Sequence, residues 1–106
     1  MPYPLPYKET EEELQQKVIN LAELTGHLVY HTYDSRKSQK GFPDLVIVKP
    51  EMARPIFAEL KSEKGQLRPD QATWKLVLEA MKGVDYRLWR PSSWPEIEET
   101  LTGRKR

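Results

Sequence analysis

Cysteine is absent from the 106 residues of the chain. Its absence excludes disulfide bonds, thiol catalysis and cysteine-based zinc sites, and fits a reducing compartment, so we expect a cytoplasmic location. Long apolar runs are also missing, since no segment approaches the roughly 20 residues of a membrane-spanning helix. The first residues, MPYPLPYKE, lack the apolar stretch of a signal peptide.

The chain has little excess charge of either sign. Lysine and arginine number 17 against 16 aspartates and glutamates, a net charge of +1, so composition alone does not indicate a nucleic-acid-binding protein. The basic residues are instead local, between residues 34 and 40 and at 104–106. The length predicts a single domain over residues 1–106, with an extended N-terminal arm (1–8) and a basic tail (103–106).

Two short apolar runs dominate the stretch GFPDLVIVKPEMARPIFAELK, residues 41–61. Leu45–Val48 and Ile56–Leu60 are rich in β-branched residues and are bounded by prolines, which is typical of strands. Pro50 and Pro55 cannot continue a central ladder, so the connection lies between them. The pattern therefore predicts an antiparallel pair of strands.

Pairing these strands about their midpoint places Asp44 opposite Glu59, with Lys61 on the same face. Two neighbouring carboxylates on an apolar sheet repel each other, and a hard cation such as Mg²⁺ relieves the repulsion. The lysine adds positive charge where a phosphodiester would gain negative charge, so the group predicts metal-assisted phosphodiester hydrolysis. In the alternative, Asp44 caps a turn and Glu59 pairs with Lys61 on an exposed strand; the position on adjacent strands favours the catalytic interpretation.

The remaining elements follow from capping signals, periodicity and alternation. We expect helices at Thr10–Thr25, Pro69–Lys82 and Pro95–Leu101, and strands at His27–Tyr33 and Val84–Arg90. The last strand follows a helical crossover, which predicts that it is parallel to Ile56–Leu60. The fold class is therefore α/β, a helix, three strands, a helix and a strand, with a mixed sheet flanked by helices and a short C-terminal helix.

Several side chains have two interpretations at this stage. The loop residues Arg36, Lys37, Ser38, Lys40 and Gly41 are candidate DNA contacts, or merely a solvated loop. His31 is a weaker DNA-binding candidate, because a lone strand histidine is usually structural. Gln71 either orients a water or contacts a phosphate, or is an exposed first-turn residue. Trp74 is predicted in the core, and Ser93 with Glu96 predicts a capping box for the last helix.

The order of elements, with Asp44 on the second strand and Glu59-Leu60-Lys61 on the third, resembles the PD-(D/E)XK (restriction-endonuclease-like) nuclease superfamily. Further motifs look like the VRR-NUC family, in its small stand-alone form from phages and bacteria. These motifs are Thr10-Glu11…Gln15, Gly41-Phe42-Pro43-Asp44-Leu45, Glu59-Leu60-Lys61, Gly65 and Gln71-Ala72-x-Trp74. The resemblance implies a bacterial or phage-infected cell as the setting.

The resemblance also implies roles for single residues. Asp44, Glu59 and the main-chain oxygen of Leu60 would hold Mg²⁺ or Mn²⁺. Glu11, which helix physics alone would assign to the helix dipole, would join them directly or through water. Lys61 would position or activate the attacking water, and Gln71 would lie near the scissile phosphate. Arg68 departs from the Thr or Ser cap common in relatives, which predicts a looser helix start.

Stand-alone members of the family are similar to Holliday junction resolvases. This similarity implies a homodimer acting on branched DNA at four-way junctions, with a helicase or another repair protein as a possible partner. Trp89 and Trp94 are candidates for the dimer surface, although core packing competes for both. Two rival functions stay open: a nuclease for flaps, nicks or duplex DNA, and a non-catalytic DNA-binding module.

Overall fold

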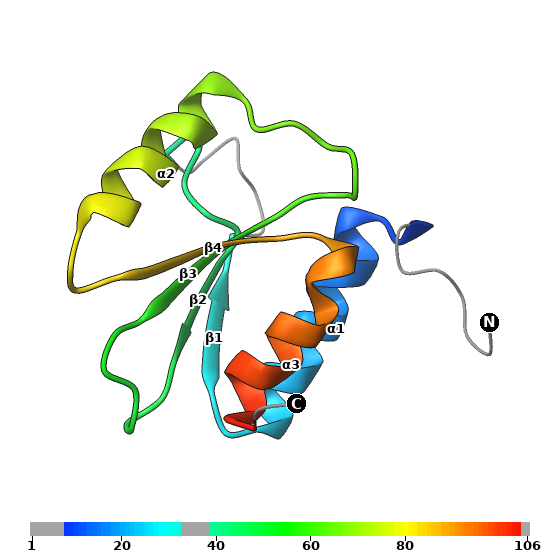
Figure 1. The fold of residues 1–106 in the computed structure, drawn as a ribbon, viewed down its shortest axis with the longest axis vertical. Coiled ribbons are helices and arrows are strands. Elements are labelled where there is room, and N and C mark those ends of the chain that lie inside the picture. The colour runs from blue at the N-terminus through cyan, green and yellow to red at the C-terminus, as the bar shows by residue number, and fades with distance from the viewer. Residues whose placement is uncertain (1–7, 33–38, 105–106) are drawn as a thin grey trace.

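The computed structural model describes residues 8–32 and 39–104. Within them, three α-helices and one 3₁₀ helix surround a four-stranded sheet (Figure 1). The elements are α1 (Glu11–Leu24), β1 (Leu28–His31), β2 (Leu45–Val48), β3 (Ile56–Leu60), α2 (Pro69–Ala80), β4 (Asp85–Trp89), η3 (Pro91–Ser93) and α3 (Trp94–Thr102). None of the helices in these two ranges has the length and apolar character that crossing a membrane requires.

The sheet has the strand order β1-β2-β3-β4 and is mixed. β2 is antiparallel to β1 and β3, whereas β3 and β4 are parallel and are joined through α2, as the crossover predicted. In the β2–β3 register, Leu45 pairs with Ala58 and Ile47 with Ile56. One step beyond the last pair, this register places Asp44 opposite Glu59, so the predicted register is confirmed.

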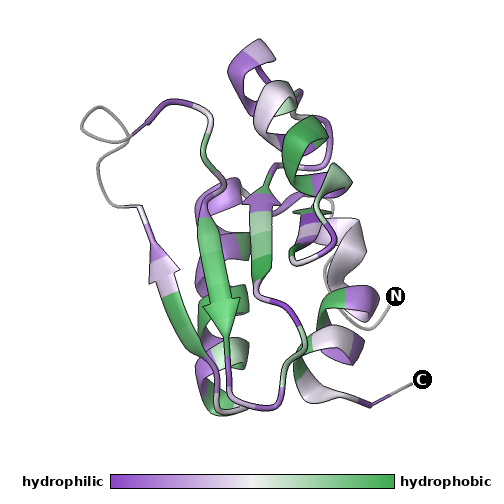
Figure 2. Cartoon of the chain, turned by 90° about the vertical axis from the view of Figure 1, so that its left-hand side faces the viewer, coloured by the Kyte–Doolittle hydropathy of each residue, from purple (hydrophilic) through white to green (hydrophobic). Residues whose placement is uncertain are grey.

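The two faces of the sheet are covered unequally (Figure 1). α1 and α3 lie on one face and enclose the hydrophobic core, to which the sheet contributes Leu45, Ile47, Ile56, Ala58, Leu60 and Trp89. α2 lies on the other face and packs against β4. Figure 2 shows β1 and β2 without a helix in front of them, and Leu28 and Tyr30 of β1 are 75% and 61% exposed.

The first helix is capped as predicted. The Thr10 side chain accepts from the Glu13 N–H at 3.1 Å, and the Glu13 carboxylate accepts from the Thr10 N–H at 3.0 Å. At the other end, His27 is buried and its N–H donates to the Ala22 carbonyl, so this residue closes α1 instead of starting the strand. β1 is therefore shorter than expected, and Tyr33 lies outside the described residues.

The prediction that Trp74 belongs to the core is wrong. Its indole Nε1 donates to the Lys40 carbonyl at 3.1 Å, and its ring meets Phe42 edge-on at 5.1 Å. Trp74 is absent from the buried cluster because α2 lies on the opposite face of the sheet from α1 and α3. The residue instead anchors the chain just before β2.

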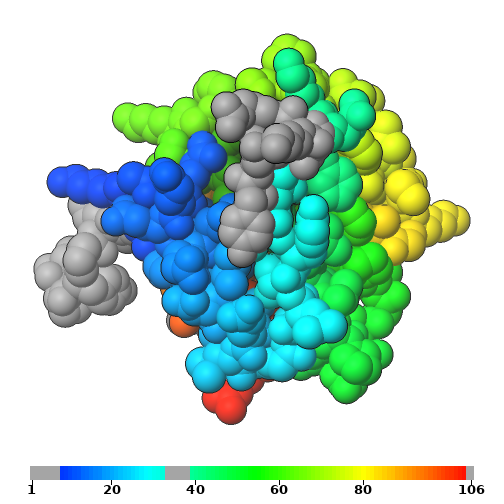
Figure 3. Space-filling view, turned by 180° about the vertical axis from the view of Figure 1, so that it is seen from behind, coloured from blue at the N-terminus to red at the C-terminus, as the bar shows by residue number. Residues whose placement is uncertain are grey.

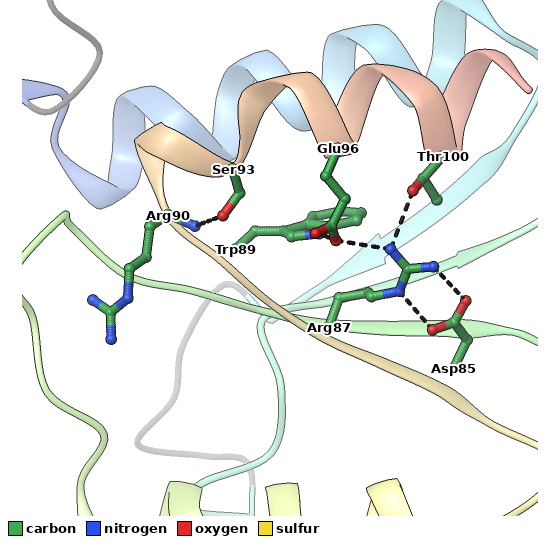
Figure 4. A network of polar contacts seen from close by, with 7 residues as sticks. All are labelled: Asp85, Arg87, Trp89, Arg90, Ser93, Glu96 and Thr100. Atoms are coloured by element: carbon green, nitrogen blue, oxygen red, sulfur yellow. Dashed lines mark hydrogen bonds and ion pairs between the residues drawn. The ribbon is translucent and has the colours of Figure 1, made fainter. Parts of the chain in front are cut away.

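The predicted Ser93–Glu96 capping box is also wrong. Ser93 Oγ accepts from the Arg90 N–H at 3.0 Å, and α3 starts without a side-chain cap. The Glu96 carboxylate accepts from Arg87 Nη1 and Trp89 Nε1, each at 2.8 Å (Figure 4). Charged and indole donors on β4 therefore outcompete the local cap.

Trp89 and Trp94 were candidates either for the core or for a dimer surface, and the structure confirms that they pack in the core. Trp89 is 0% exposed, and Trp94 packs against the core cluster. The Lys17 ammonium lies 4.1 Å from the centre of the Trp94 ring, a cation–π contact between α1 and α3. Neither side chain supplies an exposed apolar surface.

Candidate active site

A cleft of about 710 Å³ lies where β3 ends and β2 begins. The N-terminal turns of α1 and α2 flank it from the two sides of the sheet (Figure 1). Seven of the residues singled out from the sequence line it: Glu11, Lys40, Gly41, Asp44, Glu59, Lys61 and Gln71. The structure therefore brings together both proposed carboxylates, the lysine, the glutamine and the helix-borne glutamate.

The acid pair is held by the edge of the sheet. Asp44 Oδ2 accepts from the Leu60 N–H at 2.8 Å, so the third strand orients the aspartate that precedes the second. The N–H and C=O of one extended residue point to the same neighbouring strand. The Leu60 carbonyl is therefore also directed toward Asp44, where the proposed main-chain ligand would be needed.

Glu59 is 2% exposed and lies beside this aspartate. Burial, followed by the charge of Asp44 and a hydrogen bond to it, raises the pKa of Glu59 to about 9, against a smaller lowering by Lys61. Burial and the neighbouring aspartate therefore keep a proton on Glu59 near neutral pH, and a protonated carboxyl can donate to Asp44. The two carboxyl groups form an acidic site whose repulsion Lys61 offsets only in part.

Gln71 orients Glu59. Its Oε1 accepts from the Arg68 N–H at 2.9 Å, which turns its amide nitrogen toward Glu59 Oε2 at 3.1 Å. The residue is only 7% exposed, so the interpretation as an exposed first-turn glutamine is wrong. The predicted contact with a phosphate stays a prediction, whereas the contact with Glu59 is a role that the sequence did not suggest.

The start of α2 is secured despite the lack of a Thr or Ser cap. Asp70 Oδ1 accepts from the Gln71 N–H at 3.0 Å, and Gln71 accepts from Arg68 N–H. Asp70 thus satisfies the Gln71 N–H, which an N-cap hydroxyl would otherwise serve, and Gln71 satisfies the N–H of the N-cap residue Arg68. The helix start is therefore held by its own first turn.

Lys61 extends from the end of β3 and is 6% exposed. Its N–H donates to the Trp89 carbonyl at 3.0 Å, so the parallel strand β4 continues to hold the chain one residue beyond β3. Its positive charge lowers the pKa of Glu59. The ammonium group is thus electrostatically coupled to the acid pair, on the face that the alternation predicted.

Glu11 is the first residue of α1, and its exposed side chain lines the cleft. Its charge is a minor contributor to the raised pKa of Glu59. Across residues 8–32 and 39–104, no group of three acidic or histidine side chains is close enough to hold a metal ion. Of the two arrangements implied for Glu11, the absence of such a group among these residues favours the one in which water intervenes.

Gly41 allows the loop before β2 to contact the start of α2. Its φ is +87°, and a Cβ atom there would lie 2.6 Å from the Asp70 main chain and 2.9 Å from Trp74 Cδ1. Both the conformation and the contact require glycine. Together with the bond from Trp74 to Lys40, this close approach places the Gly-Phe-Pro-Asp segment against the cleft.

Only some of the proposed DNA-contact residues line the cleft. Lys40 and Gly41 line the cleft, whereas Arg36, Lys37 and Ser38 lie outside the described residues. His31 pairs with Leu45 in the sheet, so its side chain shares the core face and does not line the cleft. The next residue, Thr32, does line it, as alternation along the strand could have indicated.

Arg68 and Asp70 are cleft residues that sequence reasoning missed. Arg68 Nε lies 3.4 Å from Asp70 Oδ1, and the arginine side chain is 59% exposed. The signal that was available is their position on either side of Pro69, a proline that fixes the helix start beside the end of β3. Arg68 had been considered only as a departure from the usual cap, and Asp70 had not been considered.

The donor set fits a hard divalent cation. Asp44, Glu59 and the Leu60 carbonyl offer oxygen atoms only, which Mg²⁺ and Mn²⁺ prefer. The Leu60 N–H and Gln71 each occupy one oxygen of a carboxylate and leave the second available, as outer-shell donors do around metal ligands. Mg²⁺ is commonly held by one or two carboxylates with waters and substrate phosphates, so a third acidic ligand is not required.

The comparisons with known proteins agree with this geometry. No curated protein matches the chain. A solved structure described as a VRR_NUC domain superposes with a TM-score of 0.68 at 20% identity, over 86% of this chain and 97% of that one, a likeness that shows the fold. The model of the VRR-NUC domain matches residues 2–90, most of the sequence. The fold and the family model together show that the chain belongs to the VRR-NUC family.

Proposed function

We propose that the protein is a metal-dependent DNA endonuclease that hydrolyses phosphodiester bonds, with four-way junctions as its preferred substrate. The observation that carries the proposal is the placement of Asp44 and the buried Glu59 beside the buried Lys61 in one cleft. A domain that only bound DNA would gain nothing from a buried and a half-buried carboxylate side by side, because they repel each other and the phosphate backbone. Membership of a nuclease-like family agrees with this chemistry.

Asp44, Glu59 and the Leu60 carbonyl would hold Mg²⁺ or Mn²⁺, with Glu11 acting through water. A bound ion would supply Lewis-acid activation of the phosphodiester and of water. Gln71 keeps the Glu59 carboxylate in one orientation through its bond to Oε2. The Leu60 N–H does the same for Asp44 Oδ2. The chain thus presents fixed ligands, which lowers the cost of ordering them during the reaction.

Lys61 orients the attacking water and places positive charge beside the phosphate as negative charge develops. Its side chain is buried at the end of a strand, so the ammonium group has little bulk water to compete with. Lys40 and Arg68 at the rim of the cleft contact neighbouring phosphates. These contacts carry no base information, so we expect low sequence specificity.

The described cleft lining contains four acidic and three basic side chains. DNA therefore gains little electrostatic attraction from this lining until a cation is bound. We expect Ca²⁺, an oxygen-preferring ion, to strengthen DNA binding in the cleft relative to EDTA.

The first experiment uses a labelled four-way junction and a linear duplex of matching sequence, each with Mg²⁺, Mn²⁺ or EDTA. The variant Glu59→Gln keeps the shape of the side chain and removes its charge. Glu12→Gln is the matched control, because Glu12 is an exposed residue of the same helix turn as Glu11 and does not line the cleft. We expect metal-dependent, paired nicks in the junction that Glu59→Gln abolishes and Glu12→Gln retains.

Cleavage of both DNAs would keep the endonuclease and remove the junction preference. Junction binding without cleavage under every condition would refute the nuclease. A panel with flaps and nicked duplexes then identifies which structure is cut fastest.

A homodimer is the assembly that paired nicks require, because two symmetric cuts need two symmetric sites. Trp89 and Trp94 are not among the large apolar side chains that the described surface exposes. Those side chains are Leu24, Leu28, Tyr30, Leu76, Val77 and Met81. Sedimentation at micromolar concentration should give twice the monomer mass of 12.5 kDa. A monomer at every concentration would remove the dimer and leave the single-site chemistry intact.

A further inference from the structure

Arg90 follows the last residue of β4 and binds main-chain oxygens. Its Nη1 donates to the carbonyls of Ser62 at 2.8 Å, Glu63 at 3.2 Å and Gly65 at 2.7 Å. Figure 4 shows its side chain turned away from Arg87 and Glu96, so it takes no part in their ion pair. A partly buried guanidinium that binds three carbonyls of one short turn fixes the shape of that turn.

The turn is residues 62–65, which begin directly after Lys61. It closes on itself, because the Gly65 N–H donates to the Ser62 carbonyl at 3.1 Å. A second tie comes from the Ser92 N–H, which donates to Glu63 Oε1 at 3.0 Å. The segment after β4 therefore holds the turn, just as β4 itself holds the Lys61 N–H through the Trp89 carbonyl.

The turn also packs against the Lys61 side chain. A Cβ atom added at Gly65 would lie 3.5 Å from Lys61 Cδ and 3.0 Å from Ser62 Oγ. A lysine side chain has a flexible four-carbon stem. The position of its ammonium group is therefore defined only as precisely as the groups packed around the stem allow. Figures 1 and 3 show the segment between β3 and α2 beside the first turn of α1.

We propose that Arg90 is a positioning residue for Lys61: by holding the turn 62–65 against the lysine stem, it fixes the ammonium group in the cleft. The inference rests on the proposed nuclease function. Arg90 does not line the cleft, so it acts through the turn and not on DNA or a cation. A displacement of about 1 Å at a reacting group can lower the rate about 100-fold. A small shift of the Lys61 ammonium group should therefore change the cleavage rate measurably.

The test compares Arg90→Gln with Arg87→Gln, an arginine three residues earlier whose partners are Asp85, Glu96 and Thr100. Each change removes a guanidinium that makes three or more hydrogen bonds beside β4, so a purely structural cost should appear in both. Below the unfolding temperature we expect the single-turnover cleavage rate to fall about 10–100-fold in Arg90→Gln only. The dissociation constants for Mn²⁺ and DNA should stay within about threefold of wild type in both. Equal rates in the two variants overturn the inference.

A double-mutant cycle with Lys61→Ala tests the route of the effect. If Arg90 acts through Lys61, Arg90→Gln should not slow the residual cleavage by Lys61→Ala any further. A further loss by the same factor as in the wild-type background overturns the inference. Gly65→Ala gives a second variant that leaves Arg90 in place. Its Cβ crowds Ser62 and the lysine stem, so it should slow cleavage severalfold and should also have no effect in Lys61→Ala.

Amide hydrogen exchange provides a readout that needs no cleavage. Arg90→Gln should speed exchange of the Gly65 N–H at least about tenfold, since local opening becomes easier, and should leave the amides of α1 unchanged. Unchanged protection of Gly65 overturns the inference. A wild-type protein that binds DNA but never cuts it overturns the proposed function, whereas a cutting enzyme indifferent to Arg90 overturns only this inference.

Discussion

Two polar networks lie on neighbouring strands of this sheet. One pairs groups of opposite charge, whereas the other brings two acidic groups together. On β4, Arg87 donates to Asp85 at 2.6 Å and to Glu96 at 2.8 Å, so one guanidinium faces two carboxylates and the Trp89 indole completes the set (Figure 4). The charge of this network raises the pKa of Arg87 above its usual range, chiefly through the bond to Asp85. Every charged group in it has a partner of opposite sign.

At the end of β3, Asp44 and Glu59 face each other, and Gln71 adds only a neutral donor. The excess negative charge extends beyond the pair: burial and then the charge of Glu59 raise the pKa of Tyr86 on β4. Lys61 offsets part of the repulsion. A network arranged for stability would not place two carboxyl groups against each other with one of them buried, which is why the second network is the one expected to act on a substrate.

The largest expected effect separates the two networks by activity. Asp44→Asn keeps the bond from the Leu60 N–H but removes one of the two proposed charged ligands, so cleavage should fall at least about 1,000-fold, roughly 4 kcal/mol in barrier. Asp85→Asn is the matched control in the balanced network, and it should cut at a rate within about threefold of wild type. Single-turnover rates on the preferred DNA measure both. Comparable losses in the two variants would mean that activity reports folding and not the acid pair.

Stability should respond in the opposite direction. With EDTA at pH 8, Glu59→Gln should raise the free energy of unfolding by about 2–4 kcal/mol. The amide keeps the contacts of the protonated carboxyl, and it does not have to take up a proton when the chain folds. The folded-state pKa of Glu59, about 9, exceeds the ordinary value of 4.5. Its favourable contribution is therefore complete below pH 4.5 and is lost as the pH rises toward 9, so the advantage of the variant should vanish in acid.

Glu96→Gln supplies the contrast in the balanced network. It weakens the ion pair with Arg87 and should lower the free energy of unfolding by about 1 kcal/mol, since Glu96 is partly solvated. Urea unfolding curves at pH 4.5 and pH 8 measure both variants. A destabilising Glu59→Gln at pH 8 would contradict the assignment of repulsion to the acid pair.

The neutral member of the site network should tune cation binding. Gln71→Met keeps the length of the side chain and removes the donor to Glu59 Oε2, so Mn²⁺ affinity should fall about 10–100-fold, as is usual when an outer-shell partner of a ligand is lost. Titration calorimetry on the DNA-free protein measures the dissociation constant. Thr73→Val, on the exposed side of the same helix turn, should leave the constant unchanged. Equal constants for Gln71→Met and wild type would show that Gln71 does not support a ligand.

The sequence was sufficient for the parts of the site that depend on local rules. Prolines and the period of two determined the β2–β3 register, and this register alone placed Asp44 opposite Glu59. The Thr10–Glu13 capping box was equally local, because both partners lie within one helical turn. Likewise, a parallel pair with a helical crossover followed from the order of elements.

The failures share a different cause, because each depends on which distant group competes for a side chain. Glu96 was assigned to a cap three residues away, but Arg87 and Trp89 on β4 offer stronger donors. Trp74 has the spacing of a core residue, yet periodicity does not tell which face of the sheet a helix covers.

The smallest effect, and the one most specific to the acid pair, is a proton count. The metal-free pair retains one proton near neutral pH because burial and Asp44 raise the pKa of Glu59. A divalent cation binds the ionised form, so binding at pH 7 should release about one proton, and the affinity should rise about tenfold per pH unit before levelling off near pH 9. Mn²⁺ titrations in buffers of different ionisation enthalpy measure the proton number directly. Glu59→Gln should abolish the release even where weak binding persists, whereas Glu96→Gln should leave it unchanged, because Glu96 pairs with Arg87 and does not line the cleft. Binding without proton release in the wild type would show that both carboxylates are already charged. The pKa of Glu59 would then not be raised, and the two networks would not differ in the way proposed.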